Sequence, residues 1–319
     1  MGRPRVFIDG QAGTTGLRIR SVLAPRRDLE LLVPPDERRK DATARRELFE
    51  AADLAVLCLP DDAAREVDRW SDGVPTRVLD ASSAHRTDES WVFGLPELTP
   101  GQRAAIRSAQ CVSNPGCYAS GMLLALRPLL DAGVLPRDAP LVVHAISGYS
   151  GGGRALIERW EDPDRGLLVL PYPAPYALDR VHKHVPEVQR HAGLEGPLLF
   201  VPSVGPFRDG MRLEIPLHAS LLAGGTTAKA LWEVLSSRYR EEPFVRVHPL
   251  RDPLECDELS FDPRALNGTN RLDITVAASP VGHVLLIVQL DNLGKGAAGV
   301  AVQNINLMLG LPETTGLDG

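Results

Sequence analysis

The residues best suited to covalent chemistry surround a cysteine in the hexapeptide Ser-Asn-Pro-Gly-Cys-Tyr, residues 113–118. Asn114 is a good N-cap, Pro115 is favoured at the first helical position, and an apolar run with helical spacing follows. The pattern predicts a helix with Cys117 in its first turn, where unpaired backbone N–H groups and the helix dipole favour a thiolate. Because thiolates attack acyl carbonyls, Cys117 is a candidate nucleophile; the alternative is a small buried residue.

Two histidines in the segment His-Lys-His-Val-Pro-Glu, residues 182–187, are candidates for proton transfer. The pKa of histidine lies near neutrality, which suits an exchange of protons with a substrate held at Cys117. A His-x-His pair also binds zinc in some proteins, but no third ligand with metal-like spacing stands nearby. We therefore predict an acid/base role for one of these two histidines and no metal site.

Three glycines predict a nucleotide site near the start of the chain. Gly10, Gly13 and Gly16 follow a short apolar run and precede a helical pattern, with Thr14 and Thr15 in the same turn. Such glycines permit a tight turn and let backbone N–H groups approach a pyrophosphate at the helix N-terminus. The alternative is an ordinary loop, but the position between a strand and a helix favours the nucleotide.

Cations follow the second expected strand, residues 29–33. Arg38, Arg39 and Lys40 suit a 2′-phosphate, so the sequence favours NADP; the alternative is a solvated run of charge. Further along, Asp-Ala-Ser-Ser-Ala-His-Arg follows the expected strand at 77–80, where open α/β sheets bind ligands. Arg86 in this segment could grip a carboxylate or phosphate with its planar fork; the alternative is a surface arginine in a loop.

Two glycine-rich segments later in the chain are further candidates for cofactor binding. The expected loop at 147–154, which includes Gly148, offers consecutive small residues with backbone donors. The segment at 291–299, which includes Asn292 and Gly294, opens the last expected helix, and its glycines allow a flat ring such as nicotinamide to approach. The alternative for the second segment is a helix start packed against a neighbouring element.

The order of expected elements predicts an α/β chain with two domains. Strands alternate with helices up to about residue 113, which predicts a Rossmann-type parallel sheet for the nucleotide domain. Longer strands follow the helix at Cys117, and residues 211–220 alternate apolar and polar side chains, as a half-exposed antiparallel strand does. We therefore expect a second, α+β domain with a mixed sheet, and a boundary near residue 115.

Composition limits the classes of partner. The chain has 319 residues and a formal net charge of −6 without a Lys/Arg block, which gives no support to nucleic-acid binding. No stretch is apolar over about 18 residues, so we expect no membrane span. The four cysteines form no Cys-x-x-Cys pair, and the chain starts directly with a strand, without an apolar signal core. We therefore expect a reduced, cytoplasmic setting.

Taken in order, these motifs resemble the N-acetyl-gamma-glutamyl-phosphate reductase family in its shorter form, over essentially the whole chain. Asn-Pro-Gly-Cys-Tyr and His-Lys-His-Val-Pro-Glu are the most specific matches, and the glycine turn, Leu-Cys-Leu-Pro-Asp-Asp-Ala-Ala and Asp-Asn-Leu-Gly-Lys-Gly-Ala-Ala add to them. The family is similar to aspartate-semialdehyde dehydrogenases and phosphorylating glyceraldehyde dehydrogenases, in which the C-terminal helix returns to the nucleotide domain. The resemblance implies an NADP-binding domain of residues 1–115 plus 292–319 and a catalytic and dimerisation domain of residues 116–291.

The resemblance also implies the activity. It is the NADPH-dependent reduction of N-acetyl-gamma-glutamyl phosphate to N-acetyl-glutamate semialdehyde in arginine biosynthesis, with release of phosphate. Cys117 would form a thioester, His182 would be the acid/base, and the chain would be a homo-oligomer, a dimer or a tetramer. The expected substrate contacts are Arg86, Asn114, Tyr176 and His184. The expected cofactor contacts are Gly10, Gly13, Thr14, Thr15, Gly16, Arg38, Arg39, Ser82, Gly148, Asn292 and Gly294.

Three alternatives stay open from the sequence. The first is an aspartate-semialdehyde dehydrogenase, with the same chemistry on a substrate one methylene shorter. The second is a cofactor-binding module without turnover, and the third is a zinc protein that uses His182 and His184. The chain also departs from the longer family members, which carry a Ser/Gly-Ala-Asp-Phe-Arg pattern where this chain has Asp-Ala-Ser-Ser-Ala-His-Arg at residues 80–86.

Overall fold

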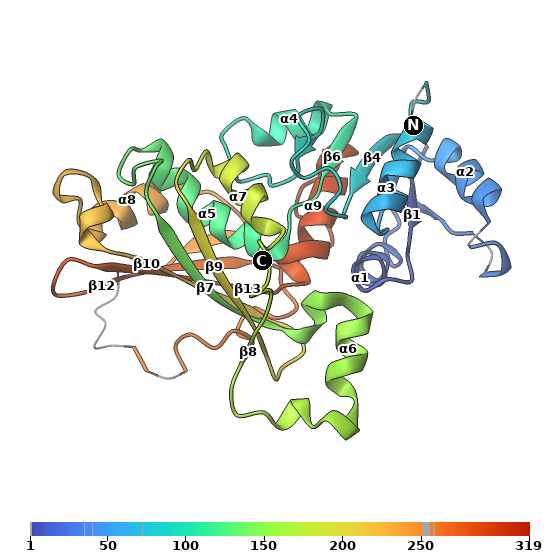
Figure 1. Ribbon diagram of the computed structural model, residues 1–319. Helices are drawn as coiled ribbons and strands as arrows, with labels where there is room; N and C mark the ends of the chain where they lie inside the picture. Colours follow the sequence, from blue (N-terminus) through green and yellow to red (C-terminus); the bar gives the residue numbers. More distant parts are fainter. Residues whose placement is uncertain (1, 35, 40, 72, 251–255, 258) are drawn as a thin grey trace. The chain divides into compact units, whose positions relative to one another are not determined.

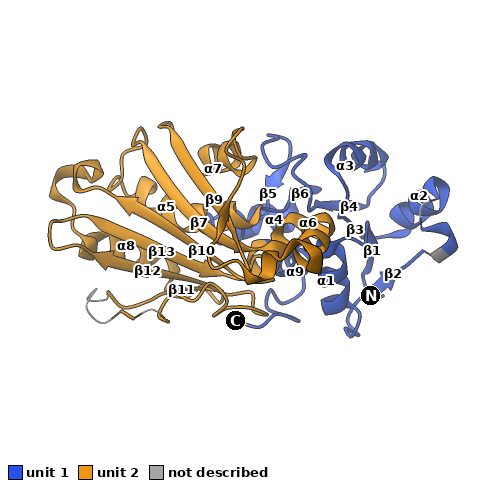
Figure 2. Cartoon of the chain, turned by 60° about the horizontal axis from the view of Figure 1, so that its bottom comes forward, with its two compact units in different colours: residues 1–115, 297–318 blue, residues 116–296, 319 orange. Residues whose placement is uncertain are grey.

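The chain folds into two compact units, shown in Figures 1 and 2 as a computed structural model. The structure describes residues 2–34, 36–39, 41–71, 73–250, 256–257 and 259–319. The first unit comprises Met1–Pro115 and Ala297–Asp318, and the second comprises Gly116–Gly296 with Gly319. The chain therefore leaves the first unit after Pro115 and returns at Ala297, slightly later than the return expected at residue 292.

The first unit is built on a parallel sheet with the strand order β2-β1-β3-β4-β6-β5. Its strands are β1 (Arg5–Asp9), β2 (Glu30–Leu32), β3 (Leu54–Leu57), β4 (Arg77–Asp80), β5 (Val92–Phe93) and β6 (Cys111–Ser113). Its helices are α1 (Thr14–Leu23), α2 (Ala42–Ala51), α3 (Asp61–Asp68), α4 (Gln102–Ser108) and α9 (Gly299–Met308).

The strands of this sheet are apolar on both faces because helices cover both. In β1, Val6 and Ile8 pack into one core with residues of α1, α4 and α9, whereas Phe7 packs into another with residues of α2 and α3. All four residues of β3 are fully buried, divided between the same two cores. This continuous apolar pattern is typical of parallel sheets, and the sequence predicted it for residues 54–59, although the strand ends at Leu57.

The strand order creates a place for a ligand. β1 lies between β2 and β3, so the chain crosses over β1 on its way from one neighbour to the other. The carboxyl ends of β1 and β3 therefore form a topological switch point, where open α/β sheets bind ligands. The turn that carries Gly10 and Gly13 follows β1 at this point and leads into α1.

The second unit is built on a mixed sheet with the strand order β11-β12-β13-β10-β7-β9-β8. Its strands are β7 (Leu141–Gly148), β8 (Ala174–Pro175), β9 (Leu198–Gly205), β10 (Met211–Leu217), β11 (Val245–Val247), β12 (Leu272–Ala278) and β13 (Val284–Leu290). Its helices are α5 (Cys117–Asp131), α6 (Gly153–Glu161), α7 (His184–Ala192) and α8 (Ala228–Tyr239).

The alternation in β10 explains how this sheet is covered. Met211, Leu213, Ile215 and Leu217 are buried, and the polar or proline residues between them are more exposed. The strand pairs antiparallel with β7 and β13, as its pattern predicted. α5 packs on β10 and β13, α7 on β9, and α8 on β11 and β12, so these helices cover the buried face (Figure 1).

Short helical turns complete the chain. They are η1 (Asp36–Arg38), η2 (Arg69–Ser71), η3 (Tyr149–Gly152), η4 (Pro163–Arg165), η5 (Leu167–Val169), η6 (Ala219–Leu221), η7 (Ala223–Gly225) and the π-helical η9 (Gly294–Ala298). The expected loop at 147–154 is instead the end of β7, η3 and the start of α6, because β7 keeps its pairing with β9 as far as Gly148. Within the described part of the chain, no helix combines the length and apolar character of a membrane span.

Candidate active site

Cys117 is the first residue of α5 and is half-buried. The helix is capped by the backbone of Gly116, and no side chain caps it. The predicted N-cap role of Asn114 is wrong because its side chain is engaged elsewhere: Nδ2 donates to the carbonyl of Ala297 at 3.0 Å, and Oδ1 accepts from Asn304 at 3.1 Å. Cys117 nevertheless lies in the first turn, so the helix dipole still favours its thiolate.

Two residues from distant parts of the sequence fix the start of α5. Glu187, buried in α7, accepts a hydrogen bond from the backbone N–H of Gly116 at 2.8 Å. A carboxylate at a helix N-terminus satisfies an open donor and interacts favourably with the positive end of the helix dipole. On another side, a Cβ added to Gly296 would lie 2.7 Å from the Cβ of Cys117, so only glycine leaves the cysteine in place.

The second unit, which contains Cys117, also contains a cluster of aromatic and imidazole side chains. One of them, Tyr118, directly follows Cys117 in the sequence. The hydroxyl of Tyr176 donates to that of Tyr118 at 3.2 Å and lies 3.4 Å from Nε2 of His182. The His182 ring is 4.7 Å from the ring of His184 and 5.1 Å from that of Phe200, centroid to centroid. The structure therefore groups three of the expected site residues: Tyr176, His182 and His184.

The phenols of this cluster stay protonated at neutral pH. Burial raises the pKa of Tyr118 well above its usual value of 10.0, and it raises the pKa of Tyr176 as well. A negative charge on Cys117 contributes to both increases in pKa, which means that the sulfur interacts electrostatically with both phenols. Two neutral hydroxyl donors therefore stand close to the candidate nucleophile.

The backbone sets the tautomer of His182. Its Nδ1 accepts a hydrogen bond from the N–H of His184 at 3.2 Å, so the neutral ring carries its proton on Nε2, the nitrogen that faces Tyr176. A neutral imidazole in this state donates a proton from Nε2 and accepts one there afterwards. This arrangement fits the acid/base role expected for His182.

The glycine turn in the first unit has the geometry of a pyrophosphate site. Gly10 has φ = 83°, and a Cβ there would lie 2.2 Å from a carbonyl oxygen at the end of β3; a Cβ on Gly16 would lie 2.7 Å from the carbonyl oxygen of Gly10. The fold itself therefore requires glycine at both positions. Gly13 differs, because its nearest neighbour would be 3.5 Å away, and it caps α1 without a side chain. The open N-terminus of α1, with Thr14 and Thr15 in its first turn, fits a dinucleotide.

The residues expected to bind a 2′-phosphate, Arg38 and Arg39, follow β2 and are exposed. Arg38 ends η1, and its guanidinium is 3.6 Å from Asp41 and 3.9 Å from Glu47. The side chain of Arg39 is exposed and makes no hydrogen bond or ion pair with any residue that the structure describes. Lys40, the third cation of the run, lies outside the described residues. The side chains of both arginines are accessible to a bound anion.

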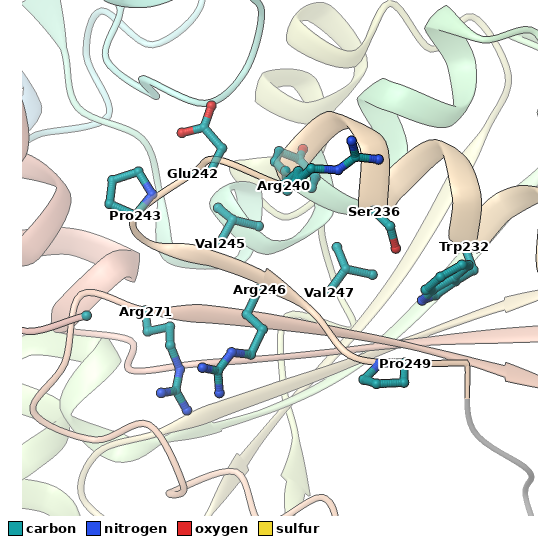
Figure 3. A pocket seen from close by; sticks show the side chains of 12 residues that line it. Trp232, Ser236, Arg240, Glu242, Pro243, Val245, Arg246, Val247, Pro249 and Arg271 are labelled. Atoms are coloured by element: carbon teal, nitrogen blue, oxygen red, sulfur yellow. The ribbon is translucent and has the colours of Figure 1, made fainter.

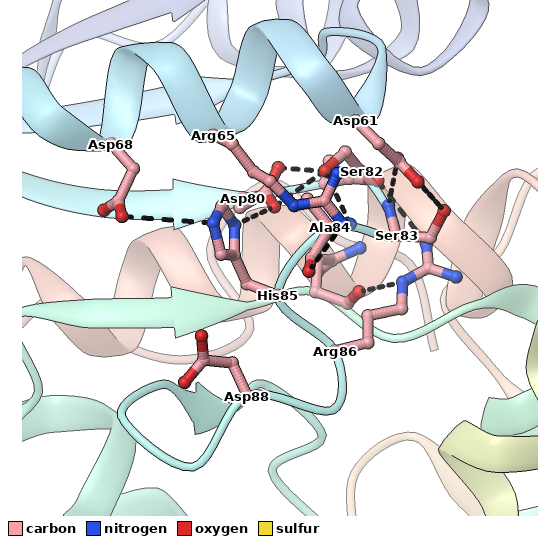
Figure 4. Close-up of polar contacts among 12 residues, drawn as sticks. Asp61, Arg65, Asp68, Asp80, Ser82, Ser83, Ala84, His85, Arg86 and Asp88 are labelled. Atoms are coloured by element: carbon pink, nitrogen blue, oxygen red, sulfur yellow. Dashed lines mark hydrogen bonds and ion pairs between the residues drawn. The ribbon is translucent and has the colours of Figure 1, made fainter.

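The loop after β4 is held by buried hydrogen bonds (Figure 4). The carboxylate of Asp80 accepts from the N–H and the hydroxyl of Ser82 at 2.8 and 2.7 Å, and it lies 2.7 Å from Nδ1 of His85. The imidazole of His85 stacks on Trp91 with the ring centroids 4.1 Å apart. The hydroxyl of Ser82, expected to contact the cofactor, therefore has an internal role in this loop.

Arg86 lies at the carboxyl edge of the same sheet and is buried. Its Nε donates to the carbonyl of Asn114 at 3.0 Å, and Nη2 lies 3.5 Å from the carbonyl of Ala81 (Figure 4). The guanidinium thus connects the ends of β4 and β6. Of the expected substrate contacts, the structure places Arg86 and Asn114 in the first unit, and Tyr176 and His184 in the second.

Three residues of the second unit were expected to bind the cofactor. Contacts inside the protein are enough to explain why glycine or asparagine is present at these positions. A Cβ on Gly148 would lie 2.3 Å from a backbone carbonyl of the 207–210 loop, and one on Gly294 would lie 2.0 Å from another carbonyl. The buried side chain of Asn292 accepts from the N–H of Gly210 at 2.7 Å and donates to Ser150 at 2.9 Å. Their role toward a cofactor stays a prediction.

Two other cysteines are poor nucleophiles. Burial, with the nearby carboxylates of Asp80 and Asp9, raises the pKa of the Cys58 thiol to about 12. Burial, with the charge of Asp68, raises the pKa of Cys111 to about 11. No group of three His, Cys, Asp or Glu side chains in the described ranges has the geometry of a metal site.

Sequence reasoning missed three residues around Cys117. Tyr118 and Glu187 stood inside the quoted motifs, and Gly296 stood in the last glycine-rich segment, but none received a role. Tyr118 could have been found, since a tyrosine directly after a candidate nucleophile shares its helical turn. Glu187 and Gly296 could not, because their contacts with Gly116 and Cys117 join segments that are far apart in the sequence.

Comparisons with known proteins agree with the two units. A family model described as semialdehyde dehydrogenase, NAD binding domain, matches residues 27–108, and one described as semialdehyde dehydrogenase, dimerisation domain, matches residues 117–292. The chain is 46% identical over 323 residues to N-acetyl-gamma-glutamyl-phosphate reductase 2 of Nostoc sp. strain PCC 7120, covering 99% of this chain and 100% of the relative. It is 49% identical over 318 residues to N-acetyl-gamma-glutamyl-phosphate reductase 2 of Pseudomonas putida, with the same coverage.

Solved structures with the same fold are more distant in sequence. Aspartate semialdehyde dehydrogenase II from Vibrio cholerae, complexed with ASA, superposes with a TM-score of 0.73 at 18% identity, covering 97% of this chain and 99% of that one. Aspartate semialdehyde dehydrogenase with NADP from Candida albicans superposes with a TM-score of 0.63 at 12% identity, covering 96% and 99%. At such low identity, the likeness establishes the α/β fold alone.

Proposed function

We propose that this chain, which belongs to the N-acetyl-gamma-glutamyl-phosphate reductase family, reduces N-acetyl-gamma-glutamyl phosphate to N-acetyl-glutamate semialdehyde in arginine biosynthesis and releases phosphate. The observation that carries the proposal is the position of Cys117 in the first turn of α5, in electrostatic contact with the neutral phenols of Tyr118 and Tyr176. A buried structural cysteine would need none of these features.

Cys117 performs the covalent step. Its thiolate adds to the carbonyl carbon of the acyl phosphate, the bond from that carbon to the phosphate oxygen breaks, and the electron pair leaves with phosphate. The product on the enzyme is a thioester. Backbone N–H groups that open α5 stabilise the negative charge on the former carbonyl oxygen, an effect worth about 3 kcal/mol per donor in other enzymes. The second half-reaction regenerates the thiolate when the carbon–sulfur bond breaks.

His182 handles the proton. The neutral ring donates from Nε2 to the oxygen of the substrate as charge develops there, and it takes the proton back when the aldehyde forms. The hydrogen bond from the N–H of His184 to Nδ1 keeps this proton on the correct nitrogen. Tyr176, which faces the same Nε2, stays neutral and helps to orient the ring and the substrate.

The first unit provides the nicotinamide cofactor site. A bound nicotinamide cofactor supplies the hydride that reduces the thioester. The chain's own residues hold it: Gly13 and the open N-terminus of α1 receive the pyrophosphate at the switch point between β1 and β3. Arg38 and Arg39 bind the 2′-phosphate that distinguishes NADP from NAD.

Replacement of both arginines tests the cofactor preference. The double variant Arg38→Ala/Arg39→Ala is expected to raise the KM for NADPH about tenfold or more, because charge-assisted contacts to phosphate are lost, while the KM for NADH changes little. Thermal stability should stay constant, since neither side chain is buried. Equal KM values for NADPH in the variant and the wild type would remove these residues from the site.

The assembly and setting follow from the same family. Because residues 117–292 match a dimerisation domain, we propose a homo-oligomer, a dimer or a tetramer, built through the second unit. A cytoplasmic location stays a prediction. The substrates are small molecules, and the residues that would bind them are those of the two candidate sites described above.

One assay separates this activity from its alternatives. Purified enzyme is mixed with N-acetyl-glutamate semialdehyde, NADP and phosphate, and the formation of NADPH is followed; aspartate semialdehyde replaces the substrate in a parallel reaction. We expect phosphate-dependent turnover with the acetylated glutamate derivative at a kcat/KM at least about a hundredfold higher. Preference for aspartate semialdehyde would identify the shorter substrate, and the absence of turnover with either would leave a binding module.

A further inference from the structure

We propose that the second unit carries an additional binding site, remote in sequence from the Cys117 cluster, for a small organic oxyanion with phosphate or carboxylate groups. The site is a cavity of about 520 Å³ between α8 and the strands β11 and β12 (Figure 3). Its volume falls within the range of pockets that hold small organic ligands, about 300–1,000 Å³. None of the residues that line it has a role in the reaction proposed above.

Arginines give the cavity its charge. Arg240, Arg246 and Arg271 line it, against one acidic side chain, that of Glu242; Gly319, the last residue of the sequence, also lines the cavity. That carboxylate lies 3.6 Å from Arg238, which already balances its charge. The excess of positive charge stands out in a chain whose formal net charge is −6.

Two of these cations have no counter-ion in the described part of the chain. The side chains of Arg240 and Arg246 are exposed and form no ion pair or hydrogen bond with any described residue. Arg246 is paired in register with Asp273, two residues from Arg271, so Arg246 and Arg271 are on the same face of the sheet, and both are drawn at the cavity in Figure 3. Asp273 compensates the charge of Arg271, so the charges that a bound anion would compensate are those of Arg240 and Arg246. Planar guanidinium groups bind phosphate and carboxylate with paired hydrogen bonds.

The wall of the cavity is fixed before any ligand binds. Nε of Arg271 donates to the buried carboxylate of Asp273 at 2.8 Å, and the same carboxylate lies 2.7 Å from Nε2 of His248. Trp232 is held by its indole N–H, which donates to the carbonyl of His248 at 2.8 Å. These contacts order one cationic group and one apolar surface, so little side-chain entropy is lost when a ligand binds.

A hydroxyl in the cavity lacks a partner. The Oγ of Ser236, on the turn of α8 that lines the cavity, is shielded from solvent and makes no hydrogen bond with any described group. An enclosed polar group without a partner costs about 1–3 kcal/mol. A rotation of the Ser236 side chain toward the cavity would let the hydroxyl donate to an acceptor oxygen of a ligand. Cations, an ordered apolar wall and an enclosed donor together define a ligand that is anionic, oxygen-rich and partly apolar.

Isothermal titration calorimetry on the full-length enzyme tests this site, with inorganic pyrophosphate and citrate as the two probes. The test variant is Arg240→Gln/Arg246→Gln, which removes two cations that no described residue needs. The control is Arg154→Gln/Arg165→Gln, which removes the same charge from exposed ion pairs outside the cavity. Ser236→Ala removes the enclosed hydroxyl alone.

We expect at least one probe to bind the wild type and the control alike, and the test variant about tenfold or more weakly, with a severalfold loss in Ser236→Ala. Binding should weaken as salt is added. The tighter probe identifies the group, phosphate or carboxylate. Turnover of the test variant should equal that of the wild type, which separates this site from the catalytic one. Absence of binding to the wild type by both probes, or equal binding by test variant and control, would overturn the proposal.

Discussion

At the scale of single residues, the environments of the cysteines distinguish the candidate nucleophile, Cys117, from two other cysteines of the chain. Cys117 opens a helix, whereas Cys58 and Cys111 have pKa values raised by burial and by nearby carboxylates. The pKa of a thiol determines how much thiolate is present at neutral pH, and therefore its reactivity. The structure thus gives a physical reason for the choice that the motif Asn-Pro-Gly-Cys-Tyr indicated.

The raised pKa of Cys58 predicts a pH dependence of stability. In the unfolded chain this thiol ionises near its usual value of 9.0, but in the fold it ionises only at about 12. Above pH 9 the unfolded state therefore releases a proton that the folded state keeps, so the free energy of unfolding decreases as pH rises, by about 1.4 kcal/mol per pH unit from this group. The contribution is fully present below pH 9.

The variant Cys58→Ala isolates the contribution of this thiol to the pH dependence of the free energy of unfolding. Urea denaturation of wild type and variant at about pH 8 and about pH 10.5 gives the change of unfolding free energy with pH for each protein. We expect a smaller decrease in the variant, since any cavity that the substitution leaves affects both pH values equally. Parallel decreases in the two proteins would show that the thiol ionises in the fold as it does in the unfolded chain.

At the scale of elements, glycine is present at different positions of the turn between β1 and α1 for different physical reasons. Gly10 and Gly16 are required by close contacts inside the fold, and Gly13 is not. The sequence could predict the strand, the turn and the helix, because local periodicity and glycine spacing determine them. It could not rank the glycines, since the contact at Gly10 is with the end of β3, far along the chain.

This difference predicts opposite results for two alanine variants. Gly13→Ala should keep the thermal stability of the wild type and raise the KM for NADPH about tenfold or more, because a methyl group blocks the approach of pyrophosphate. Gly10→Ala should destabilise the fold, since its φ of 83° and a 2.2 Å contact both exclude a Cβ. An unchanged KM in Gly13→Ala would mean that the dinucleotide does not bind at this turn.

The junction of η9 and α5 gives a second prediction at this scale. In Gly296→Ala the added methyl group would lie 2.7 Å from the Cβ of Cys117, so one of the two must move. We expect kcat to decrease about a hundredfold, since a displacement of about 1 Å at a reacting group has an effect of this size. Gly101→Ala is the matched control, because a Cβ there meets no atom within 4 Å.

The two rates are compared under saturating substrate, with thermal melts as a check on folding. Full activity in Gly296→Ala would show that Cys117 tolerates the displacement and that its position is not the critical feature of the site.

At the scale of the whole molecule, the chain passes between the two units twice, after Pro115 and after Gly296. In the first unit, the residue before Pro115 contacts the residue at which the chain returns: Asn114 donates to the carbonyl of Ala297. In the second unit, Gly296 packs on Cys117. Within each unit, the segment that leaves and the segment that returns are therefore in direct contact. Alternating elements predicted the parallel sheet and the first passage. The return of α9 came only from the family resemblance, since an apolar helix carries no local signal of its partner.

Most of the candidate site was predictable as motifs and little of it as contacts. Tyr176, His182 and His184 were named from the sequence, and the fold groups them in one unit. Four other residues were named as cofactor contacts, and each has a contact inside the protein that accounts for its residue type: Ser82, Gly148, Asn292 and Gly294. Small polar residues and glycines serve packing and ligands equally well, so their spacing alone cannot distinguish the two uses.

The covalent thioester on Cys117 is the claim on which the account depends, and mass spectrometry tests it directly. Enzyme is mixed with N-acetyl-glutamate semialdehyde and NADP without phosphate, quenched in acid, and examined as the intact chain and as peptides. We predict that one N-acetyl-glutamyl group accumulates on the peptide containing Cys117, disappears when phosphate is added, and never forms in Cys117→Ser. Turnover by Cys117→Ser, or wild-type turnover with the acyl group on another residue, would contradict the account.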